Sequence, residues 1–435
     1  MAYLVGVLVM VVGVLVSIAL HEVGHMVPAK RFGVRVSQYM VGFGPTLWSR
    51  TRGETEYGVK AIPLGGYVRL VGMYPPAGAV GNPTSRSWLG RVAQDAREAS
   101  SDEIRPGEDH RAFYRLSTPK KLVVMLGGPV MNLAIATVLL GIVMIGIGTP
   151  TPTSTVAVVT ACVPATAGKA CTAADPQSPA AAAGLVKGDV ITSFDGVAIT
   201  SWTQLSGLIK GAGGDTVSVV VARDGADRTL TVTPTMMDRA VVDASGAAVL
   251  GADGAATTER VGYLGVGPEF ALQRDSLAAV PAAVGTAVVG TAKIVVTLPS
   301  RIVDVAKAAF GSAPRDSNSV IGVVGIGRIA GEVAADGGGD FGLTGQVITM
   351  LSLIASLNIA LFVFNLIPLL PLDGGHVAGA LWEGARRQVA RVRGLPRPRP
   401  VDIARMMPLA YGVFVLFAGL GLLLIYADIV RPVSL

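Results

Sequence analysis

The chain has 435 residues, of which 51% are hydrophobic and 15% are charged. Soluble globular proteins carry about 25% charged residues, so this composition excludes an ordinary soluble protein and indicates a membrane core with room for a folded domain beside it. The formal net charge of +6 needs no nucleic acid to explain it, because the basic residues lie beside apolar segments, among lipid headgroups and water. We therefore expect the lipid bilayer as a partner and no nucleic acid.

Four apolar stretches reach the roughly 20 residues that a membrane-crossing helix needs. They are Tyr3–Val27, Leu122–Ile147, Val347–Leu366 and Met407–Tyr426. The first has no basic segment ahead of it and no small-residue cleavage site, so we interpret it as a retained span and not as a signal peptide. We interpret a fifth apolar stretch, Leu277–Leu298, as an interfacial helix, because a fifth span would put the two basic loops on opposite sides of the membrane.

The distribution of Lys and Arg predicts the orientation, because loops rich in these residues stay in the cytoplasm. The loop between the first two spans contains Lys30, Arg31, Arg35, Arg111, Arg115, Lys120 and Lys121. The loop between the last two contains Arg386, Arg387, Arg391, Arg393, Arg397 and Arg399. We expect both loops in the cytoplasm and the long segment 148–346 outside.

The first span ends in His21-Glu22-Val23-Gly24-His25. Residues at i and i+4 share one helix face, so His21 and His25 can offer two imidazoles to one metal ion. Glu22 lies about 100° round the helix, within reach of a water at that metal. A surface helix can carry this pattern by chance. Ionisable residues in a span are costly, however, and indicate a functional site.

Asp373 is the candidate for a third ligand. It lies in the segment Asn365–His376 after the third span, where two prolines and a glycine pair interrupt the helix. Irregular backbone at membrane depth is tolerated only where protein or a water-filled cavity surrounds it. Two histidines and a carboxylate form a catalytic zinc set. The alternatives are an Asp-Gly turn for Asp373 and a ligand role for His376, which we interpret as a supporting or turn residue. His110 is interpreted as solvated surface.

With these motifs the chain resembles the site-2 family of intramembrane zinc metalloproteases, in the bacterial form that contains a PDZ domain. The resemblance is carried by the segments 21–25, 42–45, 127–132 and 365–375, which read HEVGH, GFGP, GGPVMN and NLIPLLPLDGG. It covers nearly the whole chain and is closest to the actinobacterial branch, which cleaves anti-sigma factors. One departure is the position of Pro371, since the family often has this proline one residue earlier.

The resemblance implies a polytopic α-helical membrane protein with about four transmembrane helices, a membrane-associated β-hairpin and an extracytoplasmic mixed α/β PDZ domain. The divisions we expect are two spans with the hairpin loop, the PDZ domain, a linker with interfacial amphipathic segments, and two further spans, at residues 1–148, 153–235, 236–345 and 346–435.

Residues 38–73 are predicted to form strands and tight turns, because apolar and polar residues alternate in the segment 57–70 and glycines interrupt it. By resemblance they form the hairpin whose edge takes up an extended substrate, although an ordinary cytoplasmic hairpin has the same pattern. The residues assigned to substrate binding in this way are Gly65, Gly66, Asn132, Asn365, Pro368 and Pro371. Hydrogen bonding between helices is the competing role for the two asparagines.

Short Val- and Thr-rich strands follow from about residue 153, and Ala-Gly-Leu-x-x-Gly-Asp at 183–189 resembles a PDZ turn. Such a domain binds a peptide by strand addition, and a filter that contacts substrate ectodomains is equally plausible. The only cysteines, Cys162 and Cys171, lie in this outside segment, where a disulfide is permitted. The sequence leaves their pairing open.

We therefore expect a Zn²⁺ protease of the bacterial plasma membrane, with Glu22 as general base and the active site near the cytoplasmic side. Its expected substrates are single-span proteins such as anti-sigma factors, already cut outside. A metal transporter would need ionisable residues in several spans, and Leu122–Ile147 has none. A catalytically silent scaffold would not need Glu22.

Overall fold

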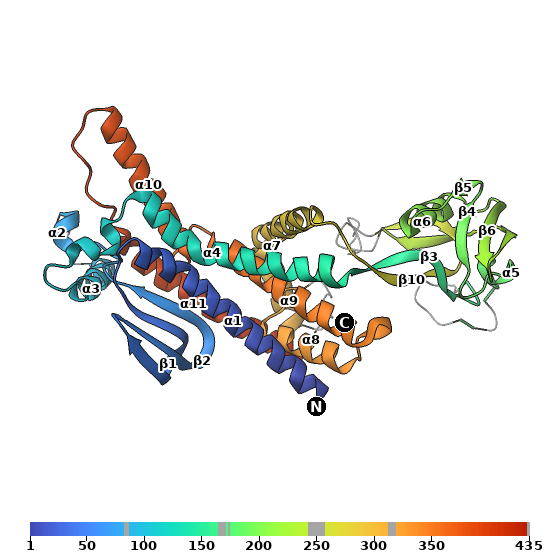
Figure 1. Ribbon diagram of the computed structural model, residues 1–435, viewed down its shortest axis with the longest axis horizontal. Coiled ribbons are helices and arrows are strands. Elements are labelled where there is room, and N and C mark those ends of the chain that lie inside the picture. The colour runs from blue at the N-terminus through green and yellow to red at the C-terminus, as the bar shows by residue number, and fades with distance from the viewer. Residues whose placement is uncertain (82–86, 164–170, 173–174, 242–256, 312–318, 433–435) are drawn as a thin grey trace. The chain divides into compact units, whose positions relative to one another are not determined.

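The computed structural model describes residues 1–81, 87–163, 171–172, 175–241, 257–311 and 319–432. The chain divides into two compact units. The first combines Met1–Ile147 with Ser276–Leu435, and the second is Gly148–Asp275. Figure 1 shows the elements of both units. Parts of the segment 236–345, which we expected to be a linker with interfacial helices, lie outside the described residues.

The first unit is built on long apolar helices. Five helices among the described residues are long and apolar enough to cross a membrane. They comprise α1 (Ala2–Arg31), α4 (Thr118–Gly141) with the π-helical turn η3 (Ile142–Ile147), α7 (Ala279–Phe310), α9 (Gly342–Asn365) with the short turn before it, and α11 (Met407–Val430) with the short turn before it. The four predicted spans lie in α1, α4, α9 and α11. The stretch that we expected at the interface lies in α7, which meets the same criterion of length and composition.

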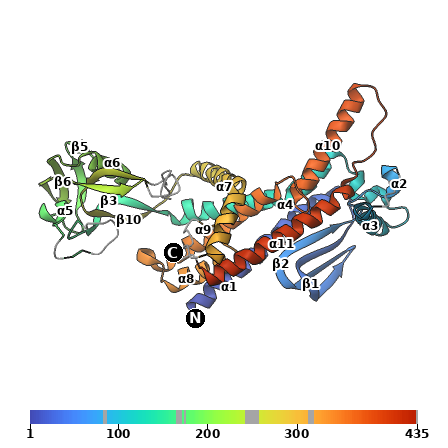
Figure 2. The same cartoon turned by 180° about the vertical axis from the view of Figure 1, so that it is seen from behind.

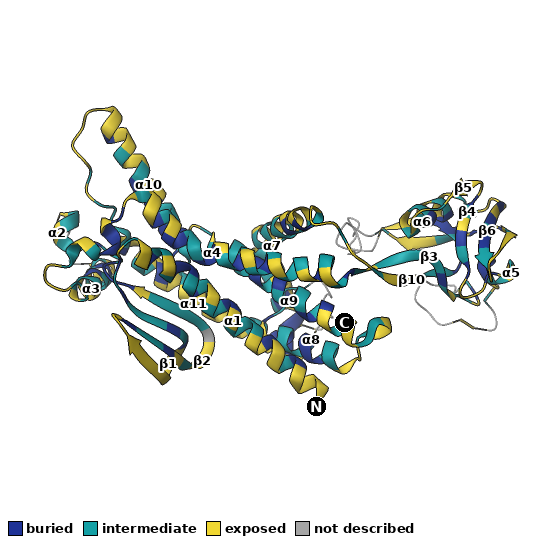
Figure 3. Ribbon diagram, viewed as in Figure 1, coloured by how far each residue is buried: buried dark blue, intermediate teal, exposed yellow. Residues whose placement is uncertain are grey.

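The outer surfaces of these helices remain apolar, and Figure 3 shows how much of α1 and α11 is exposed. On α1 the exposed side chains recur every four residues at Leu4, Leu8, Val12 and Val16, and between half and two-thirds of each is exposed. Water does not tolerate so large a continuous apolar surface, whereas lipid does, because helices satisfy their own backbone hydrogen bonds. The surface therefore fits a membrane protein.

The two halves of α7 contact different helices. Ala287 and Val288 pack with Ala136 of α4 and Ala355 of α9, whereas Val305 and Ala309 pack with Ala427 of α11. In Figure 2, where the molecule is seen from behind, α11 lies in front. The helix α8 (Val323–Ala335) packs against α1 through a cluster that includes Met10 and Ala330.

The predicted hairpin is formed by β1 (Val36–Arg52) and β2 (Thr55–Leu70). Its strands bend back on themselves, so that residues 38–41 pair with residues 66–69 and also with residues 56–59. Gly42 and Gly44 have φ angles of +93° and +80°, a backbone conformation that glycine adopts readily. The segment 66–70 therefore lies at an edge of the sheet, and no described strand pairs with its other side.

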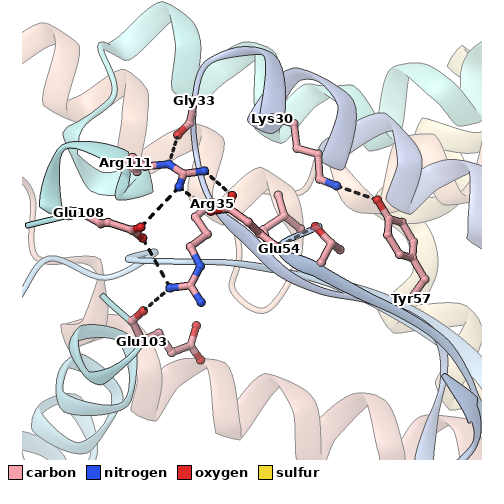
Figure 4. A network of polar contacts seen from close by, with 10 residues as sticks. Lys30, Gly33, Arg35, Glu54, Tyr57, Glu103, Glu108 and Arg111 are labelled. Atoms are coloured by element: carbon pink, nitrogen blue, oxygen red, sulfur yellow. Dashed lines mark hydrogen bonds and ion pairs between the residues drawn. The ribbon is translucent and has the colours of Figure 1, made fainter. Parts of the chain in front are cut away.

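Polar contacts attach the hairpin to the end of α1 and to the loop before α4, as Figure 4 shows. Arg111 contacts Glu54 with two hydrogen bonds, one of them 2.8 Å long, and donates to the backbone oxygen of Gly33. Lys30 donates to the hydroxyl of Tyr57 at 2.7 Å. Arg111 lowers the pKa of the Glu54 carboxyl. The ionised carboxylate is therefore the form that the network stabilises.

The remaining helices of the first unit lie at the ends of the long ones. They are α2 (Ala77–Val80), α3 (Trp88–Asp102), α10 (Asp373–Val392) and the 3-10 turns η1 (Asp109–Arg111), η2 (Phe113–Arg115), η4 (Gly339–Phe341) and η5 (Ile403–Met406). A buried ion pair between Arg97 and Asp402, with two contacts of 3.1 Å, joins α3 to η5. The arginine run of α10 and the following loop is mostly exposed.

The second unit is a β-sheet with two short helices. The strand order is β10-β3-β4-β6-β7, with β5 paired to β4. The elements are β3 (Thr149–Val159), α5 (Pro179–Ala182), β4 (Val190–Phe194), β5 (Val197–Ala198), α6 (Trp202–Gly211), β6 (Val217–Arg223), β7 (Ala226–Val232) and β10 (Val266–Gln273); β8 (Thr235–Ala240) and β9 (Thr258–Tyr263) form a separate pair. Phe194, Ile191 and Leu205 lie in its core.

The strands of this unit extend past the boundaries that we expected. Val266 of β10 pairs with Val159 of β3, and Gln273 pairs with Thr149, so the compact unit extends to Asp275, past the predicted range 153–235. Such a pairing joins residues more than 100 positions apart, and no local pattern reveals it.

The turn at 183–189 is held by an ion pair. Arg223 donates to both oxygens of the fully buried Asp189 at 2.7 and 2.8 Å, and this contact lowers the pKa of Asp189. Cys162 and Cys171, whose pairing the sequence leaves open, are joined in a disulfide with a Cα–Cα distance of 5.9 Å.

Candidate active site

Three side chains from two distant segments converge at one point. Nε2 of His21 and Nε2 of His25 lie 3.2 Å apart, and each lies 3.3 Å from Oδ2 of Asp373. Within the described residues, this is the one cluster of three His, Cys, Asp or Glu side chains that can hold a metal ion. The structure therefore brings together the three residues that the sequence predicts as ligands.

The geometry of the cluster fits zinc. With metal–ligand distances of about 2.0–2.1 Å, the donor atoms of a tetrahedral zinc site lie roughly 3.3 Å from one another, and the three atoms have this spacing. Oδ2 of Asp373 is buried and has no hydrogen-bond partner among the described residues. Such an atom is costly to bury, and a cation between it and the two imidazoles would satisfy it.

The positions of the ligands follow from the local structure. His21 and His25 share a face of α1 by their spacing. Asp373 is the first residue of α10. The segment between α9 and α10 turns tightly, so that Gly374 and Gly375 lie against the backbone of residues 366–370. A Cβ atom on Gly374 would lie 2.2 Å from the oxygen of Ile367. The glycine pair therefore permits the tight turn that presents Asp373.

A buried ion pair holds α10 against α4. Nζ of Lys121 contacts the two carboxylate oxygens of Glu383 at 3.1 and 2.9 Å, and Arg387 also pairs with Glu383. Glu383 lies on the same helix as Asp373, so this anchor limits how far Asp373 can move from the histidines. No local sequence pattern predicts this ion pair, because its partners are 262 residues apart.

Three residues of α4, at i, i+4 and i+8, contact the histidines of α1. His25 donates from Nδ1 to the backbone oxygen of Val124 at 2.8 Å. Gly128 lies opposite the ligand nitrogens, where a Cβ atom would be 2.2 Å from Nε2 of His25. The side chain of Asn132 lies 3.1 Å from Nδ1 of His21. No local pattern assigns Val124 to the site, and for Gly128 the signal in the sequence is its place in the segment 127–132 that carries the family resemblance.

Glu22 lies beside the edge of the hairpin. The side chain is largely buried, and it lines the same cavity as Val68 of the strand edge. A Cβ atom on Gly66 would lie 3.1 Å from Cγ of Glu22. Glycine at position 66 therefore allows the strand edge to approach Glu22 closely.

A cavity of about 370 Å³ contains these groups. It is lined by the three candidate ligands and Glu22, and by five of the six residues that the resemblance assigns to substrate binding, namely Gly65, Gly66, Asn132, Asn365 and Pro371. Pro368 is not among its lining residues. His376 lines the cavity outside the three-residue cluster, and its buried Nδ1 has no hydrogen-bond partner within the described residues. His110 is exposed, as expected.

The chain is similar to known proteases over most of its length. Residues 9–396 match peptidase family M50. The chain is 35% identical over 444 residues to the zinc metalloprotease Rip1 of Mycobacterium tuberculosis H37Rv, with all of both chains covered. It is 33% identical over 448 residues to Rip1 of Mycolicibacterium smegmatis, again over the full length of both. It is 29% identical over 406 residues to the metalloprotease MmpA of Caulobacter vibrioides, which covers 89% of this chain and 90% of that protein.

These matches confirm the family, the enzyme class and the metal that the sequence predicts. The two segments that supply the converging side chains both lie within the matched region. The chain belongs to peptidase family M50, the site-2 proteases, and is a membrane zinc metalloprotease.

Proposed function

We propose that His21, His25 and Asp373 hold the zinc ion and that Glu22 is the general base of an intramembrane peptide-bond hydrolysis. The observation that carries this proposal is the convergence of three ligand atoms at mutual distances of 3.2–3.3 Å in the cavity that Glu22 lines. Zinc held there supplies a Lewis acid and lowers the pKa of water. Glu22 accepts the proton from the attacking water and returns it to the leaving amine nitrogen.

The edge of the hairpin presents the substrate. A peptide bond inside a helix is shielded by its own hydrogen bonds, so the substrate must become extended before its carbonyl carbon can be attacked. Residues 66–70 offer an unpaired strand edge beside Glu22, and an extended peptide can add to such an edge. Gly65 and Gly66 leave room for its backbone, while Asn365 and Pro371 line the facing wall.

The protein is proposed to cross the bacterial plasma membrane four times, through α1, α4, α9 and α11. The second half of α7 carries Arg301, Asp304 and Lys307, which are costly in the hydrocarbon layer, so α7 is assigned to the outer interface. The basic loops then lie in the cytoplasm, and the active site lies near the cytoplasmic side. Residues 1–148 and 346–435 form the membrane core in this scheme.

The second unit is proposed to be an extracytoplasmic PDZ domain, which begins within the predicted range 153–235 and includes β8, β9 and β10. Its five-stranded path with two short helices supports this assignment, and so does the buried Asp189 at the end of the predicted turn. Its partner is a peptide or the trimmed ectodomain of a substrate.

The proposed substrates are single-span membrane proteins of the anti-sigma-factor type, cut outside before they reach this protease. The full-length similarity to mycobacterial Rip1 places the chain among actinobacterial relatives, which is the branch that the sequence motifs resemble. A metal transporter is the alternative, but within the described residues only one cluster can hold a metal, whereas transport needs successive sites.

The test is cleavage of a tagged single-span anti-sigma factor by the detergent-purified chain, run beside Glu22→Gln with bound zinc quantified in both. We expect zinc in both proteins and cleavage only by the wild type. Zinc with equal cleavage in both would remove Glu22 from the mechanism. Absence of zinc from both would remove the metal site and the function with it.

A further inference from the structure

We infer that Asn132 orients the ligand His21 and does not bind the substrate; this inference rests on the zinc site of the proposed function. Asn132 lies in α4, and its side chain has no exposed surface. Although Asn132 borders the cavity, protein atoms cover its side chain completely, so a substrate backbone could not contact it without a rearrangement. Its Nδ2 lies 3.1 Å from Nδ1 of His21, the ring nitrogen that does not face Asp373.

The position of the hydrogen on His21 follows from the geometry of the site. Nε2 of His21 faces Nε2 of His25 and Oδ2 of Asp373. A nitrogen that ligates a metal must present a lone pair, so the hydrogen of the neutral imidazole is on Nδ1. That N–H group lies in a buried environment and requires an acceptor.

Asn132 can supply this acceptor. Its Oδ1 is buried and has no hydrogen-bond partner among the described residues. The oxygen and nitrogen of an amide exchange places when the group turns by half a rotation, and the hydrogen-bond network decides between the two arrangements. With Oδ1 towards His21, the imidazole donates from Nδ1 and the buried oxygen gains a partner. One rotation therefore satisfies both groups.

The other histidine is held in the same way. His25 donates from Nδ1 to the backbone oxygen of Val124 at 2.8 Å, and Val124 and Asn132 lie one turn of α4 to either side of Gly128. Both ligand rings thus receive their acceptor from one face of α4. Partners of this kind fix the orientation of a ligating histidine, and their loss typically weakens metal binding by about 10–100-fold.

The test measures the zinc affinity of the full-length chain in detergent, by competition with a chelator, for the wild type, Asn132→Leu and Asn132→Asp. Leucine has a similar size and no acceptor, so we expect an affinity about 10–100-fold weaker. Aspartate keeps the acceptor and lacks the N–H donor, so we expect it to retain zinc within about tenfold of the wild type.

Asn358→Leu is the matched control. Asn358 is also a fully buried asparagine in a long helix, and it donates to Oγ of Ser17 at 2.9 Å. Its replacement removes a hydrogen bond between helices without touching a ligand, so zinc affinity should stay within about twofold, the range of context effects. Cobalt substituted for zinc gives a second readout, because its visible absorption reports the ligand geometry, which Asn132→Leu should alter and Asn358→Leu should not.

Three results would overturn the inference. Unchanged zinc affinity in Asn132→Leu, with a raised KM for the substrate, would make Asn132 a substrate contact. Equal weakening by aspartate and leucine would mean that Asn132 donates to His21 and does not accept. Equal weakening by Asn132→Leu and Asn358→Leu would reduce its role to helix packing. Absence of zinc from the wild type would instead overturn the proposed function, and this inference with it.

Discussion

A Cβ atom on Gly128 would lie 2.2 Å from Nε2 of His25 and 2.7 Å from Nε2 of His21. Real Cβ atoms do not approach other heavy atoms to within 3.0 Å, so even the smallest side chain at this position would displace a ligand nitrogen. The same face of α4 is close to the backbone of α1, since a Cβ atom on Gly127 would lie 1.9 Å from the oxygen of Gly24. Glycine residues therefore set both the approach of the two helices and the space for the metal.

Gly128→Ala should abolish zinc binding and proteolysis while the protein remains folded. The methyl group occupies the point on which the ligand nitrogens converge, and alanine is a better helix former than glycine. Zinc content by mass spectrometry, with helicity by circular dichroism, measures both effects. Gly141→Ala, where nothing lies within 4 Å of the new Cβ, is the control and should keep its zinc. Full zinc occupancy in Gly128→Ala would contradict the role assigned to this glycine.

Glu383→Leu should destabilise the protein by about 3–5 kcal/mol, because it leaves the buried Lys121 without its counter-charge. Lys121→Met should cost less, since Arg387 still pairs with Glu383. The double variant Lys121→Met, Glu383→Leu should recover part of the loss, because Lys121 no longer lies buried without a counter-charge, whereas Arg387 has lost its partner. Thermal unfolding in detergent tests the order of the three variants. If the losses of stability in the two single variants simply add up in the double variant, the Lys121–Glu383 ion pair is not the source of the stability.

Gly66→Val should lower kcat by about a hundredfold, since a displacement of about 1 Å at a catalytic group costs this much. The new side chain meets Ile18 and Cγ of Glu22 at 3.0 and 3.1 Å, so it moves the base or the strand edge. Zinc content should not change, because the three atoms nearest to a Cβ atom on Gly66 do not belong to a zinc ligand. Thr51→Ala, at the exposed far end of the hairpin, is the control and should match the wild type in single-turnover cleavage.

The second unit should lose part of its stability in acid. Arg223 lowers the pKa of Asp189 below the value of about 3.9 that an unfolded chain has. The ion pair therefore stabilises the folded unit above about pH 4 and ceases to do so as the pH falls through the folded pKa. Hydrogen exchange of β4 and β6 amides should show Asp189→Asn less protected than the wild type at pH 7. The difference should shrink at pH 3, and a constant difference would rule out this ionisation as its cause.

The hairpin and the second unit show which features local sequence patterns can predict and which they cannot. Alternation with glycine at residues 57–70 predicts strands, and the structure contains them. The double pairing of residues 38–41, and the pairing of β10 with β3, depend on segments that meet only after the chain has folded. Periodicity carries no information about such partners, so the compact unit Gly148–Asp275 extends beyond the range 153–235 that the sequence predicts for the PDZ domain.

The sequence by itself determined the spacing of His21 and His25, because a helix repeats every 3.6 residues and a membrane-length apolar run must be helical. It also predicted Asp373 as the third ligand, since a carboxylate in irregular backbone at membrane depth requires a partner. Only the tertiary structure decided how α4 serves the site. Val124, Gly128 and Asn132 are an ordinary helix face until α4 packs against α1. Contacts between residues about 100 positions apart arise from packing, and packing is a property of the folded chain.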